Sequence, residues 1–104
     1  NHKNKFKNVH SWHLFVIKFN LKKLKISYRK IFNKFKKNKI QVGVHYYPVH
    51  LHKYYKSKYK VNKKYLPNTS NLNNTYISLP LYPDLSYKDQ DEIFKILKGI
   101  DNLE

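Results

Sequence analysis

Imidazole and phenol side chains gather in one short stretch of this chain, VHYYPVHLHKYY at 44–55. These groups donate hydrogen bonds to sugar hydroxyls and phosphate oxygens, and aromatic rings stack on sugars or bases. The stretch begins in a predicted strand that ends at Pro48, and the rigid end of a strand is a favoured place for ligand-binding side chains. A polar strand end with tyrosines packed along its edge is the alternative interpretation, and the pattern alone leaves both open.

Six histidines also suggest a metal site, and His50 and His52 have the spacing of a chelating pair. No carboxylate lies near them, because every acidic residue is at or after Asp84. Metals such as zinc usually take three protein ligands with a supporting shell. The chain has no Cys and no G-x-S-x-G, H-E-x-x-H or phosphate-loop motif. We therefore expect neither a metal site nor a hydrolytic centre.

The chain is strongly basic, with 22 Lys and Arg against 6 Asp and Glu and a formal net charge of +16. Such a surface could bind polyanions by counterion release. Arg29 is the single arginine, however, whereas dedicated nucleic-acid binders rely on arginine for bidentate contacts to phosphate and guanine. We favour a solvated lysine-rich surface and expect no nucleic-acid partner. A stand-alone polyanion-binding or nucleic-acid-binding module is the alternative.

The length of 104 residues fits one small domain. No apolar run approaches the roughly 18 residues of a membrane span, and no signal-peptide pattern is present, so we expect a cytoplasmic protein without a membrane partner. The sequence also contains no Met, although a complete translation product begins with one. We therefore expect a piece of a longer protein.

Two predicted strands and a helix between them lead to the candidate site. A run of aromatic and β-branched residues over 12–19 predicts a central strand, in which His13 would pack in the core or at an edge. Ser27 can cap the following helix. The apolar stripe of that helix would consist of Tyr28, Ile31, Phe32 and Phe35. Alternation predicts the next strand over 40–46, where Gly43 leaves room for another backbone or a ligand.

After the site, we expect a short helix or an irregular turn over 50–60, an exposed loop over 61–74 and a strand over 76–79. The last element has a clear helix signal, because Ser86 and Asp89 form a capping box. Its buried stripe would consist of Ile93, Phe94, Leu97 and Ile100. The predicted fold class is α+β, a small mainly antiparallel sheet with helices on one face, in the order β-α-β-loop-β-α.

Three segments in this order and spacing resemble one known family. They are SWHLF at 11–15, IQVGVHYYPVHLHKYY at 40–55 and LPLYP at 79–83, with Arg29 in the intervening helix. Together they resemble the C-terminal domain of DegT/StrS-type sugar aminotransferases. Within that family, the string at 40–55 is most similar to transaminases of pseudaminic acid biosynthesis. Each segment alone would be a weak signal, whereas the combination is specific.

The resemblance implies a homodimeric, pyridoxal-phosphate-dependent enzyme of the aspartate-aminotransferase fold type. It implies transfer of an amino group from glutamate to a keto group on a nucleotide-linked sugar, a UDP-sugar, in surface-sugar biosynthesis. It also implies that residues 1–10 connect to a large domain carrying the cofactor lysine, and that 11–104 form the small domain, inactive alone and without catalytic residues of its own. Carried over by position, the substrate-binding residues are His45, Tyr46, His50 and Tyr55.

Overall fold

The structure of the chain is a computed structural model that describes residues 11–101. The connector predicted at 1–10 lies outside the described residues. Along the chain, the elements are β1 (Phe15–Lys18), α1 (Tyr28–Lys37), the 3₁₀ helix η1 (Val49–Leu51), α2 (Lys53–Tyr59), α3 (Pro67–Leu72), β2 (Tyr76–Leu79) and α4 (Tyr87–Asp101). The α+β fold class is confirmed, with a two-stranded antiparallel sheet.

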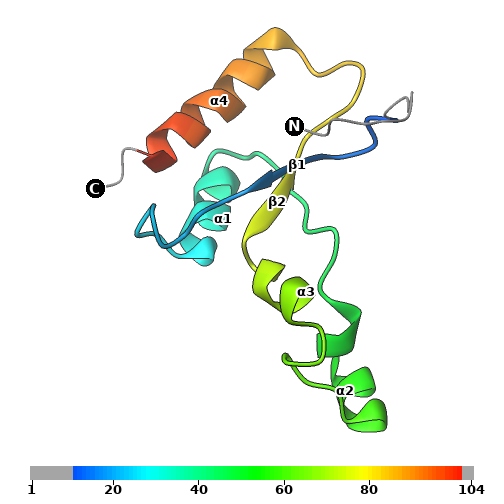
Figure 1. Cartoon of the computed structure of the whole chain (residues 1–104). Coiled ribbons are helices and arrows are strands. Elements are labelled where there is room, and N and C mark those ends of the chain that lie inside the picture. Colours follow the sequence, from blue (N-terminus) through cyan, green and yellow to red (C-terminus); the bar gives the residue numbers. More distant parts are fainter. Residues whose placement is uncertain (1–10, 102–104) are drawn as a thin grey trace, which may run out of the picture.

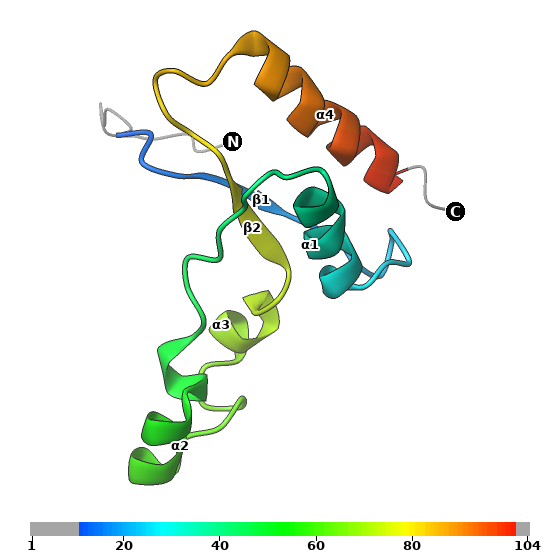
Figure 2. The ribbon, with the colours of Figure 1, turned by 180° about the vertical axis from the view of Figure 1, so that it is seen from behind.

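The elements form two parts that extend in different directions. β1 and β2 lie together in the middle, with α1 and α4 to one side of them (Figure 1). The segment with η1, α2 and α3 extends from the other end of the strand pair, and the reverse view shows the same separation (Figure 2). The Cα radius of gyration is 16.5 Å. A compact domain of this length has a radius of about 13 Å, so this chain is more extended than one.

β2 has a neighbour on each of its two sides. On one side it pairs antiparallel with β1, in the register that places Ile17 opposite Ile77. On the other side, Ser78 forms an isolated bridge with Gly43. Two backbone hydrogen bonds close this bridge, from the Gly43 N–H to the Ser78 carbonyl at 2.9 Å and from the Ser78 N–H to the Gly43 carbonyl at 2.8 Å. The strand predicted at 76–79 is therefore confirmed and has neighbours on both sides.

Two other strand predictions need correction. The strand predicted over 12–19 is shorter, and it lies at the edge of the described sheet. The predicted central position is wrong because a continuous apolar run does not distinguish an edge strand from a central one. The strand predicted over 40–46 is wrong, since only Gly43 pairs with β2. The start of that segment belongs to the end of α1, where the Ile40 N–H donates to the Phe35 carbonyl at 3.1 Å. After Gly43 the chain bends at His45 and continues into η1, so the pairing with β2 stops at this bridge.

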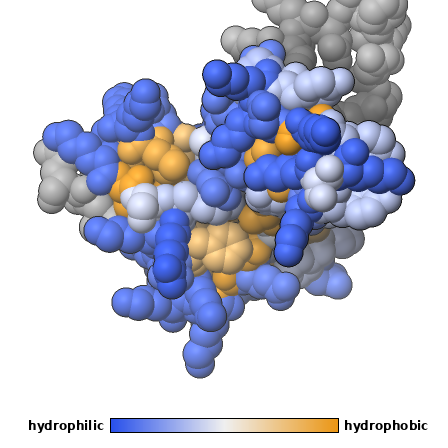
Figure 3. All heavy atoms as spheres, turned by 90° about the horizontal axis from the view of Figure 1, so that it is seen from below, coloured by the Kyte–Doolittle hydropathy of each residue, from blue (hydrophilic) through white to orange (hydrophobic). Residues whose placement is uncertain are grey.

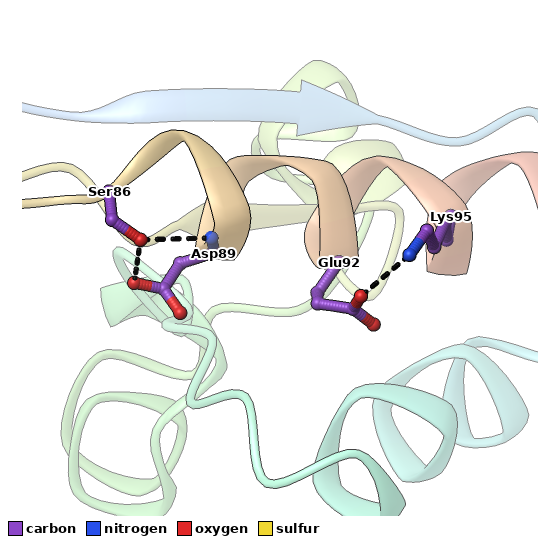
Figure 4. Close-up of polar contacts among 4 residues, drawn as sticks. All are labelled: Ser86, Asp89, Glu92 and Lys95. Carbon is purple, nitrogen blue, oxygen red and sulfur yellow. Dashed lines mark hydrogen bonds and ion pairs between the residues drawn. The ribbon is translucent and has the colours of Figure 1, made fainter.

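Serine side chains begin both long helices, as predicted. Ser27 Oγ accepts an N–H of the first turn of α1 at 3.3 Å. Ser86 Oγ accepts the Asp89 N–H at 3.1 Å and donates to the Asp89 carboxylate at 2.6 Å (Figure 4). One turn further along α4, Lys95 and Glu92 form an exposed ion pair at 2.7 Å (Figure 4). A side-chain cap contributes about 0.5–2 kcal/mol.

The hydrophobic core lies between the sheet, α1 and α4. It consists of Phe19, Ile26, Ile31, Phe35, Val42, Ile77, Ile93, Ile96 and Ile100. The stripe predicted for α1 is confirmed, because Ile31 and Phe35 are completely buried and its other two members pack partly buried against them. Figure 3 shows how hydrophilic side chains surround and interrupt the apolar surface on one face of the molecule. The core is therefore small and lies close to solvent.

The predicted stripe of α4 is wrong at one position. Phe94 is 54% exposed, and Ile96 takes its place beside Ile93 and Ile100. The buried positions are three and four residues apart, which places them on one face of the helix, whereas Phe94 lies to the side of that face. The Lys98 ammonium covers the Phe94 ring at 4.7 Å from its centroid. A lysine therefore takes up part of the exposed ring face.

The segment after the candidate site is more helical than predicted. The short helix or turn expected over 50–60 is confirmed, as η1 and α2. The loop expected over 61–74 contains a helix, α3, and is wrong for those residues. Pro67 occupies the start of α3, a position where its fixed φ and missing N–H are tolerated. The Asn, Ser and Thr content of this segment resembles that of a loop, which explains the missed helix.

Candidate functional site

His45 is the centre of a compact polar cluster beside β2. Its Nδ1 lies 2.8 Å from Ser78 Oγ, and its ring meets the Tyr46 ring edge-on, with centroids 4.9 Å apart and planes at 84°. The peptide bond between these two neighbours is cis. Beneath the imidazole lies Gly43, where a Cβ would overlap the ring. The His45 cluster, as we call it, consists of Gly43, His45, Tyr46, Tyr76 and Ser78.

Two tyrosines hold the backbone of this cluster in place. The Tyr76 hydroxyl donates to the Tyr46 carbonyl at 3.1 Å, and the Tyr28 hydroxyl donates to the Tyr76 carbonyl at 2.9 Å. Partial burial, with a smaller contribution from Tyr76, raises the pKa of Tyr28 above its ordinary value. The phenol therefore stays protonated and keeps donating. These two hydrogen bonds connect α1 to β2 and β2 to the candidate site.

His50 lies in different surroundings from His45. It is 8% exposed, and its Nε2 is 2.8 Å from Ser70 Oγ. The Ser70 hydroxyl donates to the Lys63 carbonyl at 2.8 Å. Because a hydroxyl has one proton, Ser70 must accept a hydrogen bond from His50 Nε2–H. This contact links η1 to α3.

Tyr55, the fourth predicted residue, lies on α2. It is 39% exposed and stacks on Tyr59, with centroids 6.2 Å apart and planes at 14°, while Tyr54 meets it edge-on. The structure therefore brings His45 and Tyr46 together. Within the described residues, no hydrogen bond or ring contact joins His50 or Tyr55 to them.

The sequence interpretation missed the serine and tyrosine partners of the site. Ser78 is 3% exposed and Tyr76 is half-buried, and the available signal was a serine inside an otherwise apolar strand, YISL. The prediction for His13 is packing in the core or at an edge. His13 is exposed, so it does not pack in the core. A groove of about 500 Å³ lies between 38–41 and α4, but none of its lining residues belongs to the His45 cluster.

Residues 11–101 contain neither a metal-binding cluster nor a membrane-spanning helix. No group of three or more His, Asp or Glu side chains is placed to hold a metal ion. In the same part of the chain, no helix combines the length and the apolar character needed to cross a bilayer.

Comparison with known families decides what kind of protein contains this cluster. The sequence model described as the DegT/DnrJ/EryC1/StrS aminotransferase family matches residues 1–98. The chain belongs to this family. Aminotransferases of the DegT family depend on pyridoxal phosphate. The family expected from the sequence is thus confirmed, whereas the narrower likeness to pseudaminic acid transaminases stays a prediction.

Relatives of this DegT-family chain include two curated proteins. It is 34% identical over 91 residues to the uncharacterized protein MJ1066 of Methanocaldococcus jannaschii, covering 88% of this chain and 24% of that protein. It is 34% identical over 92 residues to the spore coat polysaccharide biosynthesis protein SpsC of Bacillus subtilis, with the same coverage of 88% and 24%. The chain therefore spans about a quarter of the length of these curated relatives.

Two solved structures of a sugar aminotransferase, Spr1654 of Streptococcus pneumoniae, share the fold. The apo form superposes with a TM-score of 0.72 and the PMP form with 0.69. Each is 25% identical in sequence, and each superposition covers 86% of this chain and 22% of the other. Most of this chain thus corresponds to less than a quarter of that longer chain. The comparisons give no support to a stand-alone polyanion-binding module.

The residues of the His45 cluster do not by themselves fit a pyridoxal-phosphate site. Such a site needs a lysine for the Schiff base and a partner for the pyridinium nitrogen, commonly a carboxylate. The His45 cluster contains no lysine and no carboxylate. Asp89 and Glu92 of α4 are already engaged with Ser86 and Lys95. We therefore assign no cofactor contact to the His45 cluster.

Proposed function

We propose that this DegT-family chain is the C-terminal small domain of an aminotransferase that transfers an amino group from glutamate to a keto group on a nucleotide-linked sugar. The observation that carries the proposal is the superposition on a sugar aminotransferase, with a TM-score of 0.72 over 86% of this chain but only 22% of that one. The relationship to a spore coat polysaccharide biosynthesis protein supports a role in surface-sugar biosynthesis. In this proposal, pyridoxal phosphate is bound mainly by the large domain, outside 11–104.

The finer parts of the proposal rest on the sequence resemblance. The string at 40–55 supports a UDP-sugar substrate of the pseudaminic acid type. The same resemblance supports a cytoplasmic homodimer, in which residues 1–10 connect the small domain to the large one. A domain of this kind shapes the substrate side of the cleft and performs no proton transfer of its own.

Within the small domain, the side chains of His45 and Tyr46 support a role in substrate binding. Tyr46 is 72% exposed and offers a ring for stacking on a sugar, while His45 offers a ring nitrogen as a hydrogen-bond donor. His50 is buried and would act by holding η1 against α3, so that the backbone of the cleft keeps its shape. Tyr55 would contribute its partly exposed ring from α2.

Two experiments test this function. Sequencing of the DNA upstream of Asn1 is expected to show a continuous reading frame that encodes a large domain with a lysine after a strand; a stop codon followed by a local start would contradict the proposal.

In the intact protein, His45→Ala is expected to lower kcat/KM for the nucleotide sugar about tenfold, because one hydrogen bond of about 1 kcal/mol or slightly more is lost. The exposed His13, changed to Ala, is the matched control and is expected to leave kcat/KM unchanged. Equal kinetics for both variants would remove His45 from the site.

A further inference from the structure

We propose that Ser78 is a positioning residue for His45 and that Gly43 provides the space for the imidazole ring, so that His45 carries its proton on Nε2 and presents it as a hydrogen-bond donor. Ser78 and His45 lie 33 residues apart in the chain, and their side chains meet at 2.8 Å. Only the last step, that a substrate receives this donor, rests on the proposed function. The positioning itself is a property of the chain and can be measured without activity.

The direction of the hydrogen bond follows from the surroundings of Ser78. The residue is 3% exposed, and its backbone N–H and carbonyl are both used by Gly43. Within the described residues, the only polar partner of its hydroxyl is His45 Nδ1. A buried hydroxyl donates its single proton wherever an acceptor is available. Ser78 therefore donates to Nδ1, and neutral His45 holds its own proton on Nε2.

Gly43 is needed at its position for space rather than for backbone conformation. No glycine of the described chain has a positive φ, so other residues could adopt the same backbone. A Cβ on Gly43, however, would overlap His45 Cε1 and lie 3.1 Å from Nδ1 and 3.3 Å from Nε2. The edge of the imidazole therefore rests on the glycine. Any side chain at this position would push the ring away from Ser78.

His50 provides an internal comparison, because its hydrogen bond with a serine has the opposite direction. Its Nε2–H donates inward to Ser70, because the Ser70 proton goes to the Lys63 carbonyl. Both histidines thus pair with a serine and both carry the proton on Nε2. His45, which is half-buried, uses the other nitrogen for its serine, and its Nε2–H has no hydrogen-bond partner among residues 11–101. The two serines therefore hold their histidines for different purposes.

The direct test is NMR of the imidazole nitrogens in the full chain labelled at histidine. We expect His45 to show a protonated Nε2 and an unprotonated, hydrogen-bonded Nδ1. Ser78→Ala should shift the signals of His45 toward a mixture of the two neutral forms and leave those of His50 unchanged, and Ser70→Ala should do the reverse. Unchanged His50 signals also report that the variant is folded. A wild-type His45 protonated on Nδ1, or His45 signals that do not respond to Ser78→Ala, would overturn the proposal.

Two further variants separate positioning from a general effect on folding. Ser78→Thr keeps the hydroxyl and is expected to retain the His45 signals, whereas Gly43→Ala keeps Ser78 and should displace the ring and reproduce the Ser78→Ala spectrum.

In the intact protein, Ser78→Ala should lower kcat/KM for the nucleotide sugar up to tenfold, with Ser78→Thr restoring it. Adding Ser78→Ala to His45→Ala should cause no further loss. Full additivity of the two losses would contradict the coupling. Correct NMR signals without any amination would leave the positioning intact and refute the proposed function instead.

Discussion

Ser78 Oγ and His45 Nδ1 lie 2.8 Å apart and join the middle of β2 to the segment that follows the Gly43 bridge. The same serine bonds through its backbone to Gly43, so three of its polar groups hold one short stretch of chain. Such a residue sets the direction of the imidazole more firmly than a loop could, because it belongs to a paired strand. The candidate site of this DegT-family chain is therefore built on the sheet.

The buried His50 is expected to contribute to stability through Ser70. His50→Ala and Ser70→Ala should each lower the free energy of unfolding by about 1–3 kcal/mol, since each leaves a polar group without its partner. The double variant should lose less than the sum, because both changes remove the same hydrogen bond. Denaturant unfolding of the chain measures these values. His52→Ala, an exposed change in the same segment, is the control; a cost equal to that of His50→Ala would contradict the assignment.

The capping box of α4 gives a second stability prediction. Ser86→Ala removes both hydrogen bonds to Asp89 and should cost about 0.5–2 kcal/mol of unfolding free energy. Ser57→Ala is the matched control, because Ser57 lies within α2 at an exposed position, where alanine has the higher helix propensity. Thermal unfolding should therefore show a lower midpoint for the first variant and not for the second. A common shift for both would mean that Ser86 does not act as a cap.

Lys60 ends α2 in the left-handed region, with φ 51° and ψ 27°. A residue with a Cβ is disfavoured there by roughly 1 kcal/mol, and glycine is not. Lys60→Gly is therefore expected to raise the unfolding free energy by up to about 1 kcal/mol. Lys56→Gly, inside the same helix, removes the same charge and should instead lower it by about 1 kcal/mol. Chemical denaturation of the two variants side by side gives the comparison, and destabilisation by Lys60→Gly would refute it.

The raised pKa of Tyr28 predicts how stability depends on pH. Burial, and to a smaller degree Tyr76, makes the folded chain hold this phenolic proton more tightly than the unfolded chain does. The contribution to stability is therefore complete below the unfolded pKa and is lost as the pH rises through the folded pKa. Tyr28→Phe lacks this group, so its unfolding free energy should fall less steeply above about pH 10 than that of the wild type. Equal slopes would show that Tyr28 is not the titrating group.

Local signals in the sequence predicted much of the fold. Ser27 and Ser86 cap the two long helices because a cap needs only its own first turn, and β2 is bounded by Pro80. The segment at 40–46 alternates like a strand, but only Gly43 pairs with β2 and the chain bends at His45, which the alternation does not indicate. α3 was missed because its composition is that of a loop and its contact with His50 comes from elsewhere in the chain.

The candidate site shows the same division between local and tertiary information. His45 and Tyr46 are adjacent in sequence, so their proximity could be predicted. The pairing of His45 with Ser78 spans 33 residues and depends on the Gly43 bridge, and no local pattern encodes it. His50 lies five residues from His45 in the chain but faces α3, because η1 turns the backbone away from the sheet.

The most direct measurement of the proposed function is nitrogen transfer by the intact protein that contains this chain. The protein would be incubated with pyridoxal phosphate, glutamate labelled at its amino nitrogen and a UDP-linked keto-sugar, and the sugar product would be analysed by mass spectrometry. We expect the label to appear in an amino-sugar nucleotide, and we expect His45→Ala, but not His13→Ala, to reduce the rate of its appearance. The proposed function would be contradicted if the label stayed in glutamate and every keto-sugar nucleotide tested remained unchanged.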